Sequence, residues 1–294
     1  MNRNSFRLSI AVIFALSAAP LTAQRAPLPD SIVPPASADS AIVFAPVADQ
    51  SAGEPFFTAT DAWLGLGFAA GVVALAPLDL TLADALQDST LQVHGVLRDF
   101  ADGFRLLGFP GTVIVGGSMY AIGRVGGNDR LAAMGLHSTE AVVLSLGIVG
   151  TIKGLAGRAR PARNPDDPFD MRFARGLTEG SDYRAFPSGH TAAAFAFAAA
   201  VTSEMRRHSP EASPWVGAAL YTGAALVGVS RIYHNRHWAS DVIGGAAIGT
   251  FSGLKVVHYH YRNPENPLDR WLLATMILPT TDGGLAIVWT APMK

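Results

Sequence analysis

The sequence predicts an all-α protein, a helical bundle of about six core helices followed by a small C-terminal β-hairpin. Hydrophobic residues make up 49% of the 294 residues and charged residues only 15%, against roughly 25% charged residues in an average soluble domain. The apolar residues fall into blocks that are too long for typical strands and rich in Ala, Leu, Gly and Val, which indicates helices. This composition points to a bilayer or to an unusually large apolar core.

Net charge and cysteine usage narrow the possible functions. The formal net charge is -1, and no basic stretch carries interleaved aromatic residues, so a nucleic acid is not expected as a partner. The chain contains no cysteine, which excludes disulfides and thiolate metal sites and leaves the redox compartment unspecified.

The first 23 residues have the pattern of a secretory signal peptide. Arg3 and Arg7 precede an apolar run from Leu8 to Leu16, and small residues follow up to Ala23, after which cleavage is expected. An uncleaved membrane anchor is the alternative, although the run is shorter than the ~20 residues that a span needs. Residues 24–57 are rich in Pro, Ala, Ser and Asp, which predicts a disordered linker.

Six apolar blocks predict the core helices of a domain that covers residues 58–262. Between the first two blocks, residues 80–107 place apolar positions at helical spacing among charged ones, which predicts an amphipathic helix or helix pair along the bundle. In the extension at 263–294, two apolar runs flank Thr-Thr-Asp-Gly-Gly at 280–284, a pattern typical of a β-hairpin. The six blocks run over 62–77, 109–123, 131–152, 189–204, 214–230 and 238–257.

The first two polar clusters between these blocks supply cations and an anion-binding turn. Lys153 and Arg160 are seven residues apart, so on one helix they would share a face. Pro161 disfavours helix at the residue before it, so the helix is expected to end there with Arg160 directed into a site. The second cluster, Pro187 to His190, precedes an Ala-rich helix. A hydroxyl and free backbone N–H groups at a helix N-terminus form an anion site.

The third cluster supplies a histidine beside a carboxylate. Ser230-Arg231 is followed after five residues by His237 and after three more by Asp241. His237 and Asp241 are i and i+4, so on one helix the carboxylate can hold the imidazole N–H and fix its tautomer. Cations, backbone N–H groups and two histidines suit a phosphoryl group, whose transfer depends mostly on positioning and charge stabilisation. His237 is then the better nucleophile, and His190 is placed to protonate the leaving oxygen.

The three clusters resemble the tripartite signature of the type 2 phosphatidic acid phosphatase and vanadium haloperoxidase superfamily. Their order and spacing match, with 25 residues between the first two motifs and 39 between the second and third. The resemblance covers about residues 130–255, and it implies an all-helical bundle and a metal-independent phosphatase without a cofactor. It assigns these roles: nucleophile for His237, general acid for His190, partner carboxylate for Asp241, and phosphate binding for Lys153, Arg160, Ser188, Gly189 and Arg231.

Each site residue has a structural explanation when taken alone, and their joint spacing is what favours a site. The cations Lys153, Arg160 and Arg231 could be stabilised by the dipoles of the helices at whose ends they are expected. Ser188 could be only an N-cap, and the pair of His237 and Asp241 could be a structural hydrogen bond.

Five other residues are expected to be structural. His258 and His260 resemble metal ligands only superficially, because i and i+2 do not share a helix face. Glu140, inside an apolar block, is expected to pair with a neighbour in the bundle, and Trp238 to pack. His234 lies between motif residues, and contact with the substrate is the alternative to a structural role.

Three functions stay open at this point. The leading hypothesis is a phosphatase of lipid phosphates such as phosphatidate, an isoprenyl diphosphate or a lipid A phosphate, because the motifs lie beside apolar helices. A vanadate-dependent haloperoxidase would use the same anion site. A non-catalytic envelope phosphate-binding protein would keep the site without turnover.

The predicted location is the cell envelope, with a phosphorylated lipid and a membrane as partners. The low charged fraction favours a membrane-embedded bundle over a soluble periplasmic one. Arg206-Arg207, Lys255 and Arg262 are expected opposite the motif loops, so the positive-inside tendency places the catalytic face in the periplasm. An exported N-terminus followed by three full spans would instead place the first motif in the cytoplasm, so these expectations conflict.

Overall fold

The computed structural model describes residues 58–273 and the strands at 275–279 and 285–289. The predicted signal peptide at 1–23, the predicted linker at 24–57 and the predicted hairpin turn at 280–284 lie outside the described residues.

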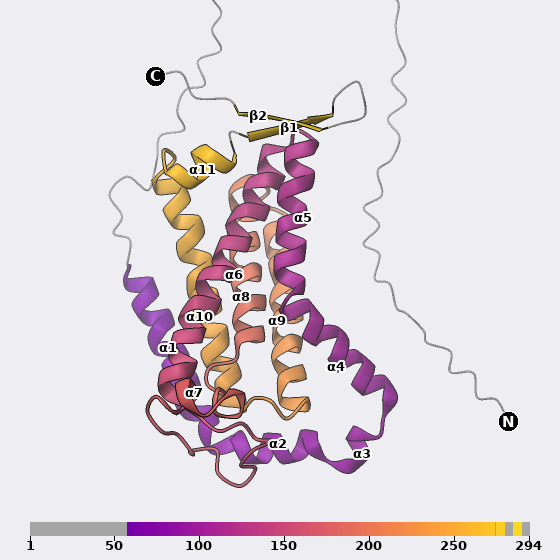
Figure 1. Ribbon diagram of the computed structural model, residues 1–294, viewed down its shortest axis with the longest axis vertical. Coiled ribbons are helices and arrows are strands. Elements are labelled where there is room, and N and C mark those ends of the chain that lie inside the picture. Colours follow the sequence, from indigo (N-terminus) through magenta and orange to yellow (C-terminus); the bar gives the residue numbers. More distant parts are fainter. Residues whose placement is uncertain (1–57, 274, 280–284, 290–294) are drawn as a thin grey trace, which may run out of the picture. The chain divides into compact units, whose positions relative to one another are not determined.

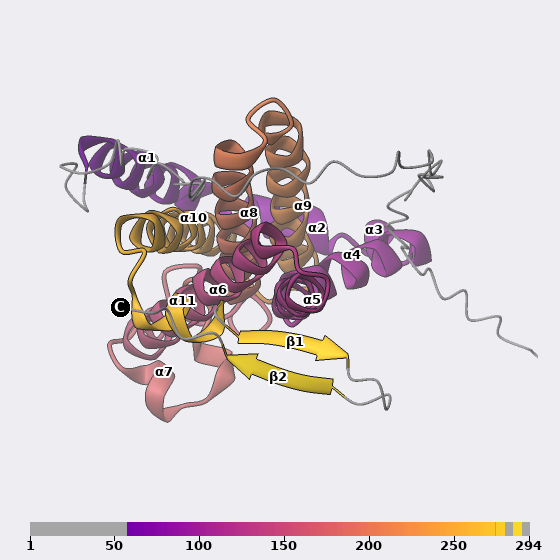
Figure 2. The ribbon, with the colours of Figure 1, turned by 90° about the horizontal axis from the view of Figure 1, so that it is seen from above.

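Six long helices form the bundle, each within a few residues of a predicted block, so the expected all-α core is confirmed. They run up and down the molecule in Figure 1, and Figure 2 shows them from above. They are α1 (Ala59–Leu75), α5 (Gly111–Val125), α6 (Asp129–Ala156), α8 (Gly189–His208), α9 (Ser213–Tyr233) and α10 (Ala239–Arg262).

Local signals at both ends of α6 set its length. The Asn128 side chain accepts a hydrogen bond from the backbone N–H of Leu131 at the N-terminus. At the other end Gly157 has φ +55, the left-handed conformation that glycine adopts most readily and that commonly ends a helix. The helix therefore stops before the end that Pro161 predicted. Lys153 and Arg160 do not share a helix face, which corrects that expectation.

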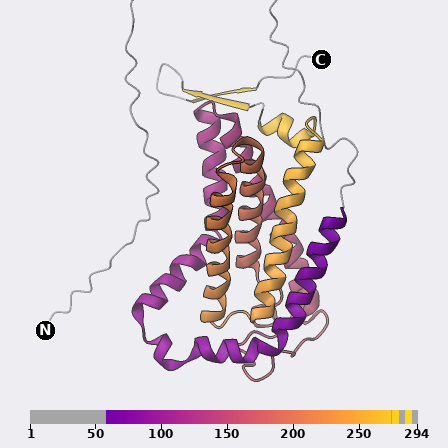
Figure 3. The same cartoon turned by 180° about the vertical axis from the view of Figure 1, so that it is seen from behind.

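Three short helices take the place of the amphipathic helix or pair predicted at 80–107. After a 3-10 turn at Ala76–Leu78 they are α2 (Asp79–Gln87), α3 (Ser89–Gln92) and α4 (Gly95–Gly108). In Figures 1 and 3, α2 and α3 cross below the bundle, and only α4 climbs along it, beside α9. It meets α5 at a bend of 51°.

The helices α8 and α10 pack at backbone contact. Gly245, Gly249 and Gly253 form a stripe on α10, and a Cβ added to them would lie 2.2 to 2.6 Å from backbone oxygens of α8. A larger residue cannot occupy these positions without moving the helices apart. Small residues at four-residue spacing are typical of close helix pairs in membranes. Both helices start at the same end of the bundle, so their N-termini lie together.

Several helices are long and apolar enough to cross a membrane. They are the segment Ala59–Gln87, α6 and α9, with the bent pair of α4 and α5 as a fourth. On α1 every side chain is at least partly exposed, and Trp63 and Val73 are 73% and 74% exposed. Exposed apolar side chains along such helices are expected to contact lipid.

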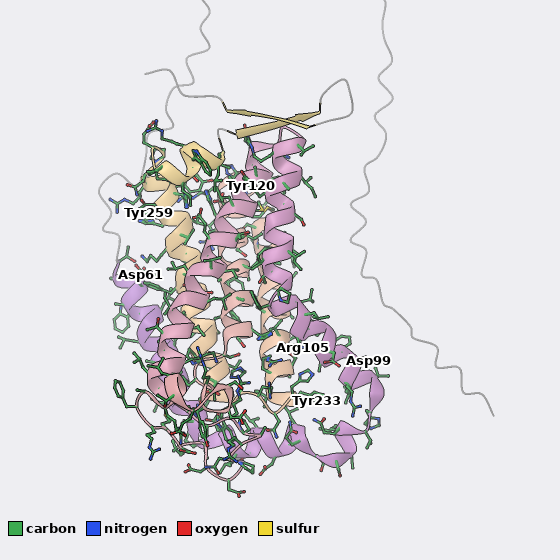
Figure 4. All side chains as sticks on the ribbon, viewed as in Figure 1. Asp61, Asp99, Arg105, Tyr120, Tyr233 and Tyr259 are labelled. Atoms are coloured by element: carbon green, nitrogen blue, oxygen red, sulfur yellow. The ribbon has the colours of Figure 1, made fainter. Side chains whose placement is uncertain are left out.

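The C-terminal elements lie at the end of the bundle opposite α2, which is called the opposite end below. Here α11 (Pro267–Leu272) follows α10, and β1 (Thr275–Pro279) pairs antiparallel with β2 (Leu285–Trp289), where a hairpin was predicted. The Tyr120 hydroxyl of α5 donates to the Leu272 carbonyl over 2.8 Å, and Figure 4 places Tyr120 near this end.

Candidate active site

The three motifs meet at the end of the bundle near α2, the lower end in Figure 1, which is called the motif end. The first lies on the last turn of α6 and the loop after it, the second at the start of α8, and the third between the end of α9 and the start of α10. Lys153, Arg160, Arg231 and His190 all act electrostatically on His237. The fold therefore brings the predicted site residues together.

His237 lies just before α10 and not on it. Its Nδ1 is 3.6 Å from Asp241 Oδ2, which is longer than a hydrogen bond. That carboxylate oxygen instead accepts from the backbone N–H of Trp238 over 2.8 Å and caps the helix. The predicted pair on one helix face is therefore not formed, because α10 begins after His237. The Nδ1 edge of the imidazole still faces Asp241.

The surroundings of His237 favour its neutral form. The side chain is 3% exposed, and burial lowers the pKa of His237 well below its ordinary value, with the nearby cations Lys153, Arg160 and Arg231 acting in the same direction. A neutral imidazole keeps a lone pair on one ring nitrogen at neutral pH. That lone pair is what a nucleophile at this position requires.

Lys153 is fixed against the loop that leads into α8. Its Nζ donates to the Arg184 carbonyl over 2.6 Å and to the Ala185 carbonyl over 3.2 Å. A Cβ built on Gly189 would lie 3.8 Å from Lys153 Cε. The lysine chain therefore runs past the first turn of α8.

Ser188 joins the second motif to the third. It is fully buried, and its backbone N–H donates to the Asp241 carbonyl over 2.9 Å. Its hydroxyl pairs with Thr191 Oγ1 at 2.8 Å and makes no capping bond to the α8 backbone. The first N–H groups of a helix have no partner within the helix, so this turn keeps donors for an anion.

Arg231 offers buried donors to the same region. The residue is 5% exposed, and its Nε and Nη1 have no hydrogen-bond partner among the described residues. Leaving such donors unpaired costs about 1–3 kcal/mol each. In contrast, the Nε of Arg160 donates a hydrogen bond to the Ser181 carbonyl over 2.7 Å. Arg231 therefore presents a fork that fits a bound oxyanion.

The bend between α4 and α5 covers His190. The Phe109 ring meets the imidazole edge-on, with centroids 6.4 Å apart. A Cβ on Gly108 would lie 3.1 Å from His190 Cβ. Arg105 of α4, labelled at the motif end in Figure 4, adds a further positive charge near His190 and Arg231.

A buried ion network lies behind Asp241. Arg158 Nη1 donates to Asp241 Oδ1 over 2.5 Å, and its Nη2 donates to Asp79 Oδ2 over 2.8 Å. Asp79 also accepts from the backbone N–H and the hydroxyl of Ser240, over 2.8 and 2.6 Å. Both carboxylates are fully buried. The network therefore joins α2, the first motif loop and the start of α10, and it fixes the carboxylate that faces His237.

No motif pattern marked Arg158 or Asp79. Arg158 is one of the six residues between Lys153 and Arg160 that the motif does not specify, and Asp79 lies 79 residues before it. The one available signal was an aspartate directly after an apolar run that continues as helix.

Two neighbouring residues turn out to be structural. His234 Nδ1 lies 2.5 Å from the Ser230 carbonyl and its Nε2 lies 3.0 Å from Asp102 Oδ1, so this histidine ties α9 to α4. Trp238 is fully buried, as predicted, and its indole N–H donates to the Ala159 carbonyl over 3.0 Å.

Comparison with known families covers the region that holds the three motifs. A family model described as the PAP2 superfamily matches residues 135–265, the region that contains all three motifs. The chain belongs to the PAP2 superfamily. The resemblance drawn from the motifs is thereby confirmed.

One curated relative is similar over most of this chain. Lipid A 1-phosphatase from Porphyromonas gingivalis is 30% identical over 254 residues, which cover 86% of this chain and 50% of that protein. The chain therefore spans about half the length of this curated relative.

Two crystal structures, of which the first is described as a PAP2 type phosphatase, are also similar. A transmembrane phosphatidylglycerolphosphate phosphatase from Bacillus subtilis has a TM-score of 0.47 at 22% identity and covers 69% of this chain and 96% of its own. LpxE from Aquifex aeolicus has a TM-score of 0.45 at 26% identity, with coverage of 62% and 96%.

The buried network gives a stability prediction. Replacing Asp79 by Ala leaves Arg158 with one of its two buried carboxylates, and breaking a buried ion pair on one side costs about 3–5 kcal/mol. Asp84→Ala is the matched control, since Asp84 is exposed on the same helix, and a surface change of this kind stays within about 0.5 kcal/mol. Chemical unfolding in detergent measures both variants. Equal stability of the two would show that the network does not hold the motif end.

Proposed function

We propose that this protein is a metal-independent phosphatase of lipid phosphate monoesters or diphosphates, acting through a phosphohistidine on His237. The observation that carries this proposal is the pairing of a buried, neutral imidazole with the unsatisfied buried donors of Arg231. A phosphate placed between them would satisfy those donors and meet a nucleophile at the same time.

The reaction follows from this arrangement in two steps. His237 Nε2 attacks phosphorus, the bond from phosphorus to the leaving oxygen breaks, and that oxygen takes a proton from His190. Water then attacks the phosphohistidine, gives a proton to His190 and releases inorganic phosphate, which restores both histidines. Lys153, Arg160 and Arg231 stabilise the charge on the equatorial oxygens throughout.

Asp241 acts on the reaction through His237. Its Oδ2 faces Nδ1 from 3.6 Å, so Nε2 is the ring nitrogen free to attack. The positive charge that the ring carries as a phosphohistidine is stabilised by this carboxylate. Arg158 holds the carboxylate in place from behind.

A lipid substrate is supported by an apolar groove whose lining includes residues next to the first and second motifs, Ile152 and Phe186. The groove has a volume of about 390 Å³ and lies between α1, α6 and α10. Phe186, one of its lining residues, directly precedes the second motif. Its walls are formed mainly by Leu64, Phe68, Val72, Ile148, Ile152, Ala247 and Ile248. Such a groove suits an acyl chain whose phosphate headgroup lies among the cations.

Similarity to the Porphyromonas gingivalis lipid A 1-phosphatase supports a phosphate on lipid A, which the sequence already suggested among the candidate substrates. Phosphatidate and isoprenyl diphosphates share the same chemistry, a phosphoryl group on an apolar anchor.

The proposed location is a membrane-embedded bundle with its catalytic face in the periplasm. Arg206, Arg207 and Arg262 then lie on the cytoplasmic side, as the positive-inside tendency favours. The start of α1, which Thr58 caps, and the motif loops lie at opposite ends of this helix, whose course Figure 3 shows in indigo. If α1 spans the membrane and the catalytic face is periplasmic, Thr58 lies in the cytoplasm. This topology is incompatible with cleavage of an exported signal peptide.

The chemistry is tested by phosphate release from detergent-purified protein with a chelator present. Substrates are phosphatidate, lipid A 1-phosphate, an isoprenyl diphosphate and an aryl phosphate. We expect chelator-resistant release and a fall of roughly 1,000-fold or more in kcat for His237→Ala, because the nucleophile is lost. His94→Ala, exposed at the start of α4, should keep full activity. Undiminished turnover by His237→Ala would contradict the mechanism.

The groove is tested by filling it. Ala247→Trp is expected to lower kcat/KM for lipid substrates roughly tenfold, since excluding two acyl methylenes at ~0.8 kcal/mol each corresponds to about that factor. Hydrolysis of the aryl phosphate should not change. The control is Ala218→Trp, exposed on α9. Equal loss for both kinds of substrate would assign the groove a structural role only.

Topology is tested by single cysteines, which label uniquely because the chain has none of its own. Asp166→Cys lies exposed in the loop after the first motif, and Glu211→Cys lies exposed between α8 and α9 at the opposite end. With a maleimide that cannot cross the inner membrane, cells with a permeabilised outer membrane should label only Asp166→Cys. Labelling of Glu211→Cys alone would place the catalytic face in the cytoplasm.

A further inference from the structure

A second cluster of titratable side chains lies at the opposite end of the bundle. His137 comes from α6, His260 from α10 and Asp269 from α11. One ligand atom of each lies within 4.8 Å of the other two, and the three side chains are 5%, 3% and 14% exposed. His260 was expected to share no site with His258. It instead stacks on His137, with ring centroids 4.0 Å apart.

Each histidine is held from its far side by a carboxylate of its own. His137 Nδ1 lies 2.6 Å from Glu204 Oε1, and His260 Nε2 lies 2.5 Å from Glu140 Oε2. A neutral imidazole has one N–H, and these hydrogen bonds use it in both rings. In the neutral rings that a metal would bind, the lone pairs are then on His137 Nε2 and His260 Nδ1.

Both lone pairs face the same carboxylate. His137 Nε2 is 3.3 Å from Asp269 Oδ1, and His260 Nδ1 is 2.7 Å from Asp269 Oδ2. The Asn266 amide donates to His260 Nδ1 over 3.2 Å and to Asp269 Oδ2 over 2.7 Å, which directs these acceptors toward one another. Between neutral rings these three buried acceptors repel, and either protons on the rings or a cation among the acceptors removes the repulsion.

We propose that His137, His260 and Asp269 bind a divalent transition-metal cation of the zinc type. Two imidazole nitrogens and one carboxylate oxygen are a common zinc ligand set. Histidines that bind a metal almost always donate their other N–H to a carboxylate, carbonyl or water, as Glu204 and Glu140 allow here.

The charges of the cluster fit a divalent ion. Glu140, Glu204 and Asp269 carry three negative charges, and neutral histidines carry none. A divalent cation leaves one net negative charge in this largely buried region. It also separates the three acceptors without requiring a second proton on either ring.

The ion has room and access. A cavity of about 350 Å³ opens onto His137, His260 and Asp269 and is lined on its outer side by Pro264 and Arg270. It offers an access path and space for a water molecule as a fourth ligand. The ion would fasten α11 to α6 and α10 at the end of the bundle away from His237, so catalysis at the motif end stays metal-independent.

Zinc binding by the full-length protein in detergent tests the site. After chelator treatment and desalting, the protein is dialysed against zinc chloride alone, and bound zinc is measured by mass spectrometry. We expect one zinc ion per chain in the unaltered protein. Binding should be at least tenfold weaker in His137→Asn and Asp269→Asn. It should be unchanged in His94→Ala and in His237→Ala, which probes the motif end. Equal zinc in all five proteins, or loss of zinc only in His237→Ala, overturns the proposal.

A measurement on the unaltered protein does not depend on the variants folding. Zinc X-ray absorption should show nitrogen and oxygen neighbours at roughly 2.0–2.2 Å, with outer-shell scattering from two imidazole rings. A first shell without imidazole scattering contradicts the assignment. Zinc should also raise the unfolding temperature of the unaltered protein and leave that of Asp269→Asn unchanged.

Discussion

The backbone contact between α8 and α10 is the constraint on which the motif end depends. Gly245, Gly249 and Gly253 let the two parallel helices approach until a Cβ would overlap the facing backbone. The approach places the Ser188 N–H 2.9 Å from the Asp241 carbonyl. The anion-binding turn of one helix and the histidine before the other are thereby held together. A side chain at Gly245 would separate them.

Buried charge is arranged differently at the two ends of the bundle. At the motif end, Arg158 is shared between two buried carboxylates, whereas Arg231 keeps buried donors without a partner among the described residues. The first arrangement is self-contained and positions Asp241, and the second is completed by an anion. At the opposite end His137 and His260 present acceptors instead, which a cation completes. The same apolar bundle therefore holds two polar sites, one that prefers an anion and one that prefers a cation.

The sequence predicted features that depend on local pattern. Apolar blocks and motif spacing are local, so the six core helices and the meeting of the three motifs were predictable. The ends of the helices were harder to predict. Gly157 ends α6 before the chain reaches Pro161, and α10 begins only after His237. The ion network and the histidine cluster were not predictable, because Asp79, His137 and their partners meet only through packing of distant helices. Apart from the place of Asp79 directly after an apolar run, nothing in the local sequence distinguishes these residues from other polar residues.

The most direct measurement is to trap the phosphoenzyme. Protein is mixed with a radiolabelled aryl phosphate, quenched in alkali, which preserves phosphohistidine, and digested for mass spectrometry. The account predicts phosphate on His237, more of it in His190→Ala because water attack loses its base, and none in His237→Ala. Phosphate on another residue, or rapid turnover that leaves no phosphoenzyme in any of these proteins, would contradict the assignment of His237 as the nucleophile.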